Sequence, residues 1–91
     1  MSDTRLLIGS LSNDLFRVAA LVGRGSPGDA TVFLLEAKRW AKSLRGLATA
    51  DYIQNISKDI ETTKVGPVSP ALAEKFLMYG VILQNYALHN Q

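Results

Sequence analysis

A stretch without any charged side chain runs from Phe76 to Leu88. Just before it, Ser69 and Pro70 form a strong helix-start signal, because the serine hydroxyl can accept a free backbone N–H and proline at the first helical position sacrifices no hydrogen bond. The apolar run from Phe76 to Leu83 covers more than two helical turns, so it points apolar groups in every direction. We therefore expect a helix that is surrounded by its own chain or by a second copy.

The composition indicates one small globular domain spanning residues 1–91. Hydrophobic residues make up 47% of the chain and charged residues 20%, which is far from the balance of a disordered segment. The chain has no cysteine. This excludes a disulfide framework, a thiolate nucleophile and a cysteine-based metal site.

The beginning of the chain does not look like a secretion signal. Asp3 comes early, and Gly9 and Ser10 interrupt the apolar residues, so the basic start and unbroken apolar centre of a signal peptide are missing. The uncharged stretch near the other end falls well short of the roughly 20 residues needed to span a bilayer. We therefore expect a cytoplasmic location and no membrane association.

Apolar residues recur at spacings of three and four along most of the chain, which predicts amphipathic helices. The expected helices cover about 3–22, 30–46, 50–63 and 70–88. The fold class is therefore all-α, as a small four-helix bundle that is either up-and-down or irregular. In the first helix, we expect Asp14 and Arg17 to lie on a solvated face opposite Leu11, Leu15 and Val18.

Glycines mark both a connection and possible close contacts. The segment from Gly23 to Asp29 contains three glycines and a proline, which predicts a loop in which Gly23 ends the first helix in a left-handed conformation. A phosphate cradle with Arg24 as counter-charge is the alternative, but no Lys-Ser or Lys-Thr pair closes the segment. Within helices, Gly80 suggests close approach of another backbone, and Gly9 either the same or simple tolerance.

The second expected helix carries the densest basic patch of the chain. Its residues are Lys38, Arg39, Lys42 and Arg45. This face could contact nucleic-acid phosphates or an acidic protein surface. The favoured interpretation is a solvated face, since the net charge is only +2. Trp40 lies on the apolar line of the same helix and is expected to be a core residue.

Motifs for catalysis or cofactor binding are missing from the sequence. The single histidine, His89, lies near the end of the chain, and no serine sits in a nucleophile-elbow pattern. With one histidine and no cysteine, a metal site is not expected either. The sequence thus predicts a protein without enzymatic activity, cofactor or metal.

The uncharged helix provides the main functional expectation. If the other helices cover only part of its circumference, the remaining apolar patch marks an interface, and a homodimer is the simplest way to cover it. The expected interface residues are Phe76, Leu77, Met78, Val81 and Ile82, with part of the first helix. We expect a self-associating interaction module that also presents a helical surface to another protein. The alternative is a nucleic-acid-associated protein using the basic patch.

Overall fold

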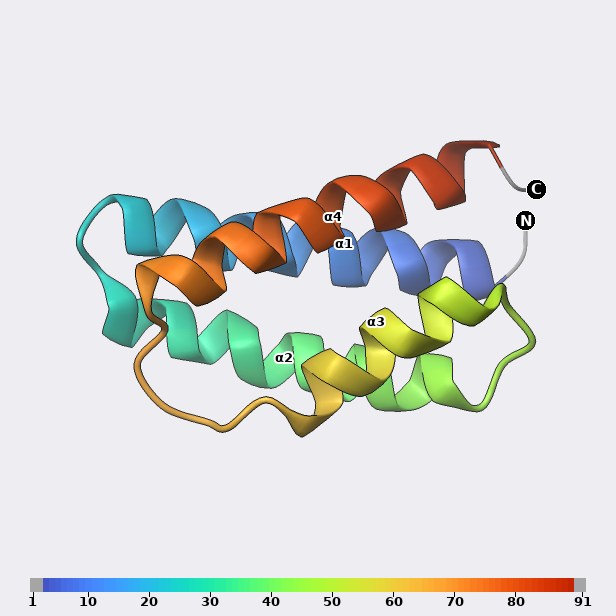
Figure 1. Cartoon of the computed structure of the whole chain (residues 1–91), viewed down its shortest axis with the longest axis horizontal. Coiled ribbons are helices and arrows are strands. Elements are labelled where there is room, and N and C mark those ends of the chain that lie inside the picture. Colours follow the sequence, from blue (N-terminus) through green and yellow to red (C-terminus); the bar gives the residue numbers. More distant parts are fainter. Residues whose placement is uncertain (1–2, 90–91) are drawn as a thin grey trace.

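A computed structural model of the chain describes residues 3–89 and shows four α-helices in this range (Figure 1). They are α1 (Asp3–Gly23), α2 (Pro27–Arg45), α3 (Asp51–Thr62) and α4 (Pro70–His89). Each helix runs antiparallel to the one before it, so that the start of α1 and the end of α4 lie at the same end of the molecule. This confirms the predicted all-α four-helix bundle and shows that its topology is up-and-down.

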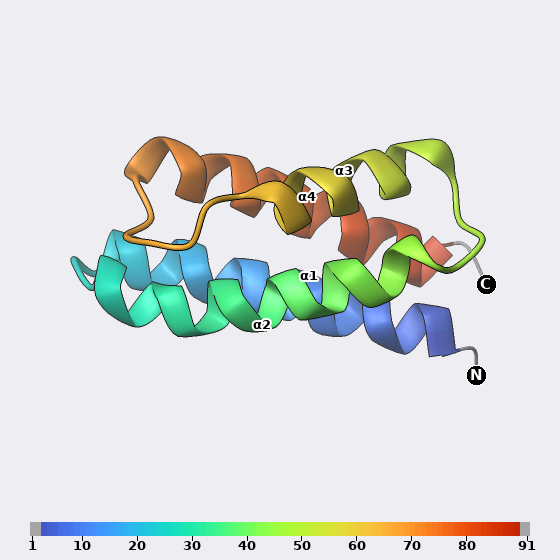
Figure 2. The same ribbon diagram turned by 90° about the horizontal axis from the view of Figure 1, so that it is seen from below.

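The helices differ in how closely they approach one another. α1 packs against both α4 and α2, and α2 also packs against α3 (Figure 2). α3 reaches α4 mainly through side chains: the rings of Tyr52 and Tyr86 meet edge to face with centroids 6.0 Å apart. By length and composition α1 is the one helix of the described residues that could cross a membrane, and in this bundle it packs between α2 and α4.

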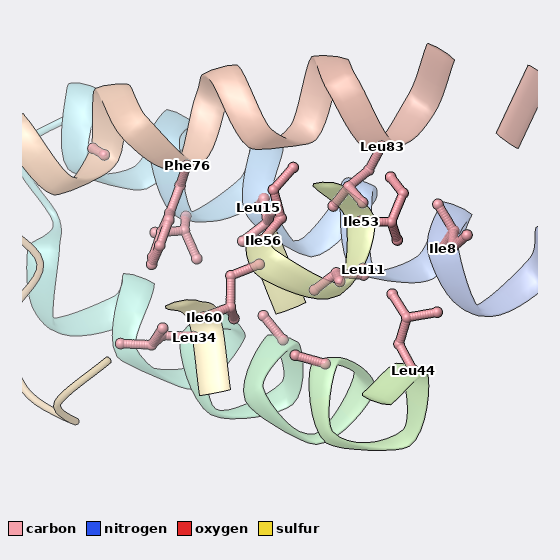
Figure 3. Packing of buried hydrophobic residues seen from close by; sticks show 14 of the residues in the cluster. Ile8, Leu11, Leu15, Leu34, Leu44, Ile53, Ile56, Ile60, Phe76 and Leu83 are labelled. Atoms are coloured by element: carbon pink, nitrogen blue, oxygen red, sulfur yellow. The ribbon is translucent and has the colours of Figure 1, made fainter. Parts of the chain in front are cut away.

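The core receives side chains from all four helices (Figure 3). Its largest fully buried apolar residues are Ile8, Leu11, Leu15, Val18, Leu34, Leu44, Ile53, Ile60, Phe76 and Leu83. In α2, Trp40 does not lie in the core as predicted. Leu34 and Ala41 are buried, whereas Phe33 and Trp40 only flank the core.

The two Ser-Pro pairs begin helices in different ways. At α4 the Ser69 hydroxyl accepts a hydrogen bond from the Leu72 N–H at 3.1 Å, as the sequence predicted. α2 begins at Pro27, earlier than the predicted position near Asp29, without a side-chain cap from Ser26. Proline fixes the backbone angle that the first helical residue needs, so Pro27 starts the helix on its own.

The α1–α2 connection is a tight turn built on the end of α1. Gly25, not Gly23, takes the left-handed conformation, with φ of 81°. The backbone N–H of Arg24 donates to the carbonyl oxygen of Ala20, and the N–H of Ser26 donates to the carbonyl oxygen of Leu21 at 2.9 Å. Because these amides bond to the last turn of α1, as in a helix C-cap, the geometry favours a connecting loop over a phosphate cradle.

Gly80 lies in the contact between α1 and α4. A Cβ atom added to Gly80 would lie 2.8 Å from Cε1 of Phe16, and the Ser12 hydroxyl donates to the Gly80 carbonyl oxygen at 2.8 Å. Gly80 is therefore in close contact with α1, but through the side chains of Phe16 and Ser12 and not through the predicted backbone approach. At Gly9, by contrast, no atom of the described residues lies within 4 Å of an added Cβ, so this glycine is not required by packing.

Candidate interaction surface

The outer side of α4 exposes large apolar side chains along most of its length. Leu77 is 47% exposed, Met78 64%, Val81 46%, Ile82 37% and Leu88 53%. We call these five residues the α4 face. The first four belong to the predicted interface set, and a shallow apolar hollow of about 400 Å³ is lined by these same four.

Phe76, the fifth residue of the predicted set, is not on this surface. Its side chain is fully buried and points from α4 into the core (Figure 3). The inward positions of α4 are Ala73, Phe76, Gly80, Leu83 and Ala87. Their spacing of three and four defines one helical side, which leaves the neighbouring positions 77, 78, 81 and 82 pointing outward.

Two hollows between α1 and α4 extend the α4 face towards α1. One has a volume of about 520 Å³ and is lined by residues that include Leu6, Gly9, Asn13, Gln84 and Leu88. The other, about 250 Å³, lies at the opposite end, where Ala19 and Val22 meet Pro70 and Leu77. Since Leu6 is itself 57% exposed, part of α1 continues the apolar surface.

The four basic residues of α2 do not form one free cationic surface. The ammonium group of Lys38 donates to the backbone carbonyl oxygens of Glu61 and Thr63, at the end of α3. Arg45 is 3.6 Å from a carboxylate oxygen of Glu61. Arg39 and Lys42 remain exposed. Two of the four predicted anion contacts are thus engaged with α3.

A polar network fastens α3 to α4 next to the α4 face. Asp59 Oδ2 accepts hydrogen bonds from the Tyr79 hydroxyl and from Lys75 Nζ, the latter at 2.7 Å. These donors, Lys75 first, lower the pKa of Asp59, while burial and the Asp59 carboxylate raise the pKa of Tyr79 to about 12. Tyr79 therefore links α4 to α3 at the edge of the core.

Asp14 is the largest departure from the predicted surface. It is 2% exposed, although the sequence placed it on a solvated face. It lies between α1 and α2 beside Glu36 and Trp40, and the Trp40 indole N–H donates to Glu36 Oε1 at 3.4 Å. One signal was present in the sequence: Asp14 follows Leu11 by three positions and precedes Val18 by four, which puts it within the apolar stripe.

Within residues 3–89, no group of three or more acidic or histidine side chains is placed to hold a metal ion. Comparison with protein families, with curated proteins and with solved structures finds no match to this chain. Functional inference therefore starts from the α4 face and from the polar groups between the helices.

Proposed function

We propose that this protein is a small, non-enzymatic, cytoplasmic interaction module that self-associates through α4 and presents a helical surface to another protein. The observation that carries the proposal is the α4 face, where five large apolar side chains are each between 37% and 64% exposed. Monomeric soluble proteins rarely leave such side chains in one contiguous patch unless it binds something.

A second copy of the chain is the occupant that the surface favours. The helix has no charged residue between Phe76 and Leu88, so two α4 faces can meet without burying an unpaired charge. In an antiparallel pair, the exposed Glu74 at one end of the face would lie near the partner's exposed His89. Two-fold pairing of one patch with itself is also the commonest form of protein association.

The gain from burial sets the expected affinity. Full burial of one such side chain stabilises by about 1.5–3 kcal/mol, so a half-exposed one contributes on the order of 1 kcal/mol. Five residues on each of two copies give on the order of 10 kcal/mol, against an association cost of about 4–15 kcal/mol. At the low end of that cost the net gain is about 6 kcal/mol, so we expect a weak dimer with a Kd of about tens of micromolar or above.

The test is solution mass by light scattering over a range of protein concentrations, at low and high salt. The wild-type chain is expected to dimerise at both salts, and Val81→Glu to remain monomeric. Val32→Glu is the matched control, because Val32 is an exposed valine on α2, away from the α4 face. A wild-type monomer at millimolar concentration, or equal dimerisation of the two variants, would contradict self-association through α4.

The alternative function, nucleic-acid binding through the basic patch, is tested in the same measurement by adding duplex DNA. Its remaining support is the exposure of Arg39 and Lys42. Phosphate contacts release counterions on binding, so this interaction would weaken steeply as salt rises. A DNA complex that forms at low salt and is lost in Arg39→Gln/Lys42→Gln would favour the alternative.

A further inference from the structure

The contact between α1 and α2 contains two carboxyl groups and too few donors for them. Asp14 is 2% exposed, and its Oδ2 has no hydrogen-bond partner among the described residues. Arg17 Nη1 is 3.7 Å from Oδ1, beyond good hydrogen-bond distance. On the α2 side, the Trp40 indole is within hydrogen-bonding reach of Asp14 but donates to Glu36 Oε1.

Two ionised carboxylates only accept hydrogen bonds, so a pair in contact needs a proton from elsewhere. We propose that Asp14 keeps its proton in the folded chain at mildly acidic pH and donates it to the Glu36 carboxylate across the α1–α2 contact, and that this contact loosens when the proton is lost to solvent. With the proton in place, one carboxyl group donates to the other. Without it, two negative charges face each other where one of them is removed from water.

The charged groups around Asp14 act in opposite directions. Burial raises its pKa most strongly, followed by the hydrogen bond and negative charge of Glu36 on α2. The Trp40 N–H on α2 and the Arg17 guanidinium on α1 lower it. Arg17 is 60% exposed and is held over the Phe33 ring, 5.3 Å from its centroid. The effects of burial and of Glu36 outweigh those of Trp40 and Arg17, so the pKa of Asp14 is raised to about 6.

Loss of the proton has a structural consequence on α2. Glu36 is the more accessible partner, because it lines an open hollow of about 370 Å³ with Arg39, Trp40 and Ser43. Repulsion from Asp14 favours rotation of the Glu36 carboxylate towards solvent, where Arg39 offers a counter-charge. The Trp40 indole would then lose its acceptor. The environment of Trp40 should therefore follow the protonation of Asp14.

Trp40 makes this proposal directly measurable, because it is the single tryptophan of the chain. Histidines ordinarily titrate in the same pH range, so the measurement uses His89→Gln as background. We expect Trp40 fluorescence to show one transition between pH 4.5 and 8, with a midpoint near the pKa of about 6. The transition should disappear in Asp14→Asn and Glu36→Gln, and it should persist in Asp29→Asn, which removes an exposed acid of α2.

A transition that persists unchanged in Asp14→Asn, or that is missing in the His89→Gln background, would overturn this proposal. Carboxyl ¹³C titration of Asp14 in the His89→Gln chain gives a second measurement that does not depend on the folding of the acid variants. A midpoint near 6 supports the proposal, and a midpoint below 5 refutes it. The fluorescence measurement is made on the dilute monomer, so its outcome is independent of self-association through α4.

Discussion

At the scale of single residues, Asp14 makes a contribution to the stability of the fold that depends on pH. Its pKa rises from 3.8 to about 6 on folding. Between these values the folded chain holds a proton that the unfolded chain has lost, so stability falls as pH rises through this window and stays level above it. Replacement by asparagine keeps the shape and supplies a donor without charge. We expect Asp14→Asn to gain on the order of 2 kcal/mol over wild type at pH 7.

Urea unfolding at pH 4 and pH 7 checks this prediction. The gain in unfolding free energy of Asp14→Asn over wild type should be small at pH 4 and close to its full value at pH 7. Asp59→Asn should instead lower the unfolding free energy, and more so at pH 7 than at pH 4. The reason is that Lys75 and Tyr79 lower the pKa of Asp59, so that its stabilising contribution requires the ionised form. An Asp14→Asn advantage of equal size at both pH values would exclude a raised pKa.

The same residue shows what single-sequence reasoning finds and misses. Helical spacing correctly identified Leu11, Leu15 and Val18 as buried. Asp14 lies within that stripe but was assigned to the solvent because it is charged, and burial of a charged group is costly unless it is paired. Arg17 on α1 and the Trp40 indole on α2 compensate part of this cost. The contribution of Trp40 comes from another helix, so no local pattern in α1 reveals it.

At the scale of helices, α2 and α3 cap each other's C-termini. Gln54 Nε2 donates to the carbonyl oxygens of Leu44 and Leu47 at 3.1 and 2.9 Å, and Lys38 does the same for the end of α3. Carbonyl groups in the last helical turn have no partner within their own helix. The helix boundaries were predictable from spacing and turn residues, whereas these caps depend on how two helices meet and were not.

Removal of the Lys38 cap should therefore destabilise the C-terminal end of α3. Lys38→Met keeps most of the aliphatic chain and removes the ammonium group, so we expect a loss of about 1 kcal/mol in unfolding free energy and faster hydrogen exchange in the last turn of α3. Lys42→Met is the control, since Lys42 is exposed on the same helix. Equal effects of the two substitutions would mean that the Lys38 hydrogen bonds contribute nothing.

Two glycines should respond in opposite directions because only one lies in a close contact between helices. Gly9→Ala places its Cβ in open space and should stabilise α1 by up to about 1 kcal/mol, the helix-propensity difference. Gly80→Ala brings its Cβ to 2.8 Å from the Phe16 ring. Although it has the same gain in helix propensity, we expect it to destabilise the fold by about 1 kcal/mol net. Thermal unfolding by circular dichroism measures both, and a stabilising Gly80→Ala would show that Phe16 moves aside freely.

At the scale of the whole molecule, self-association and folding are linked. A partner that binds only the folded chain raises its apparent stability by mass action. If the α4 face is covered by a second copy, Tm should rise with protein concentration for wild type and for Val32→Glu but stay constant for Val81→Glu. At concentrations well below Kd, Val81→Glu should match wild type, because Val81 is 46% exposed in the monomer. A wild-type Tm that is independent of protein concentration up to the millimolar range would mean that no second copy binds the α4 face. A different protein would then be the partner to look for.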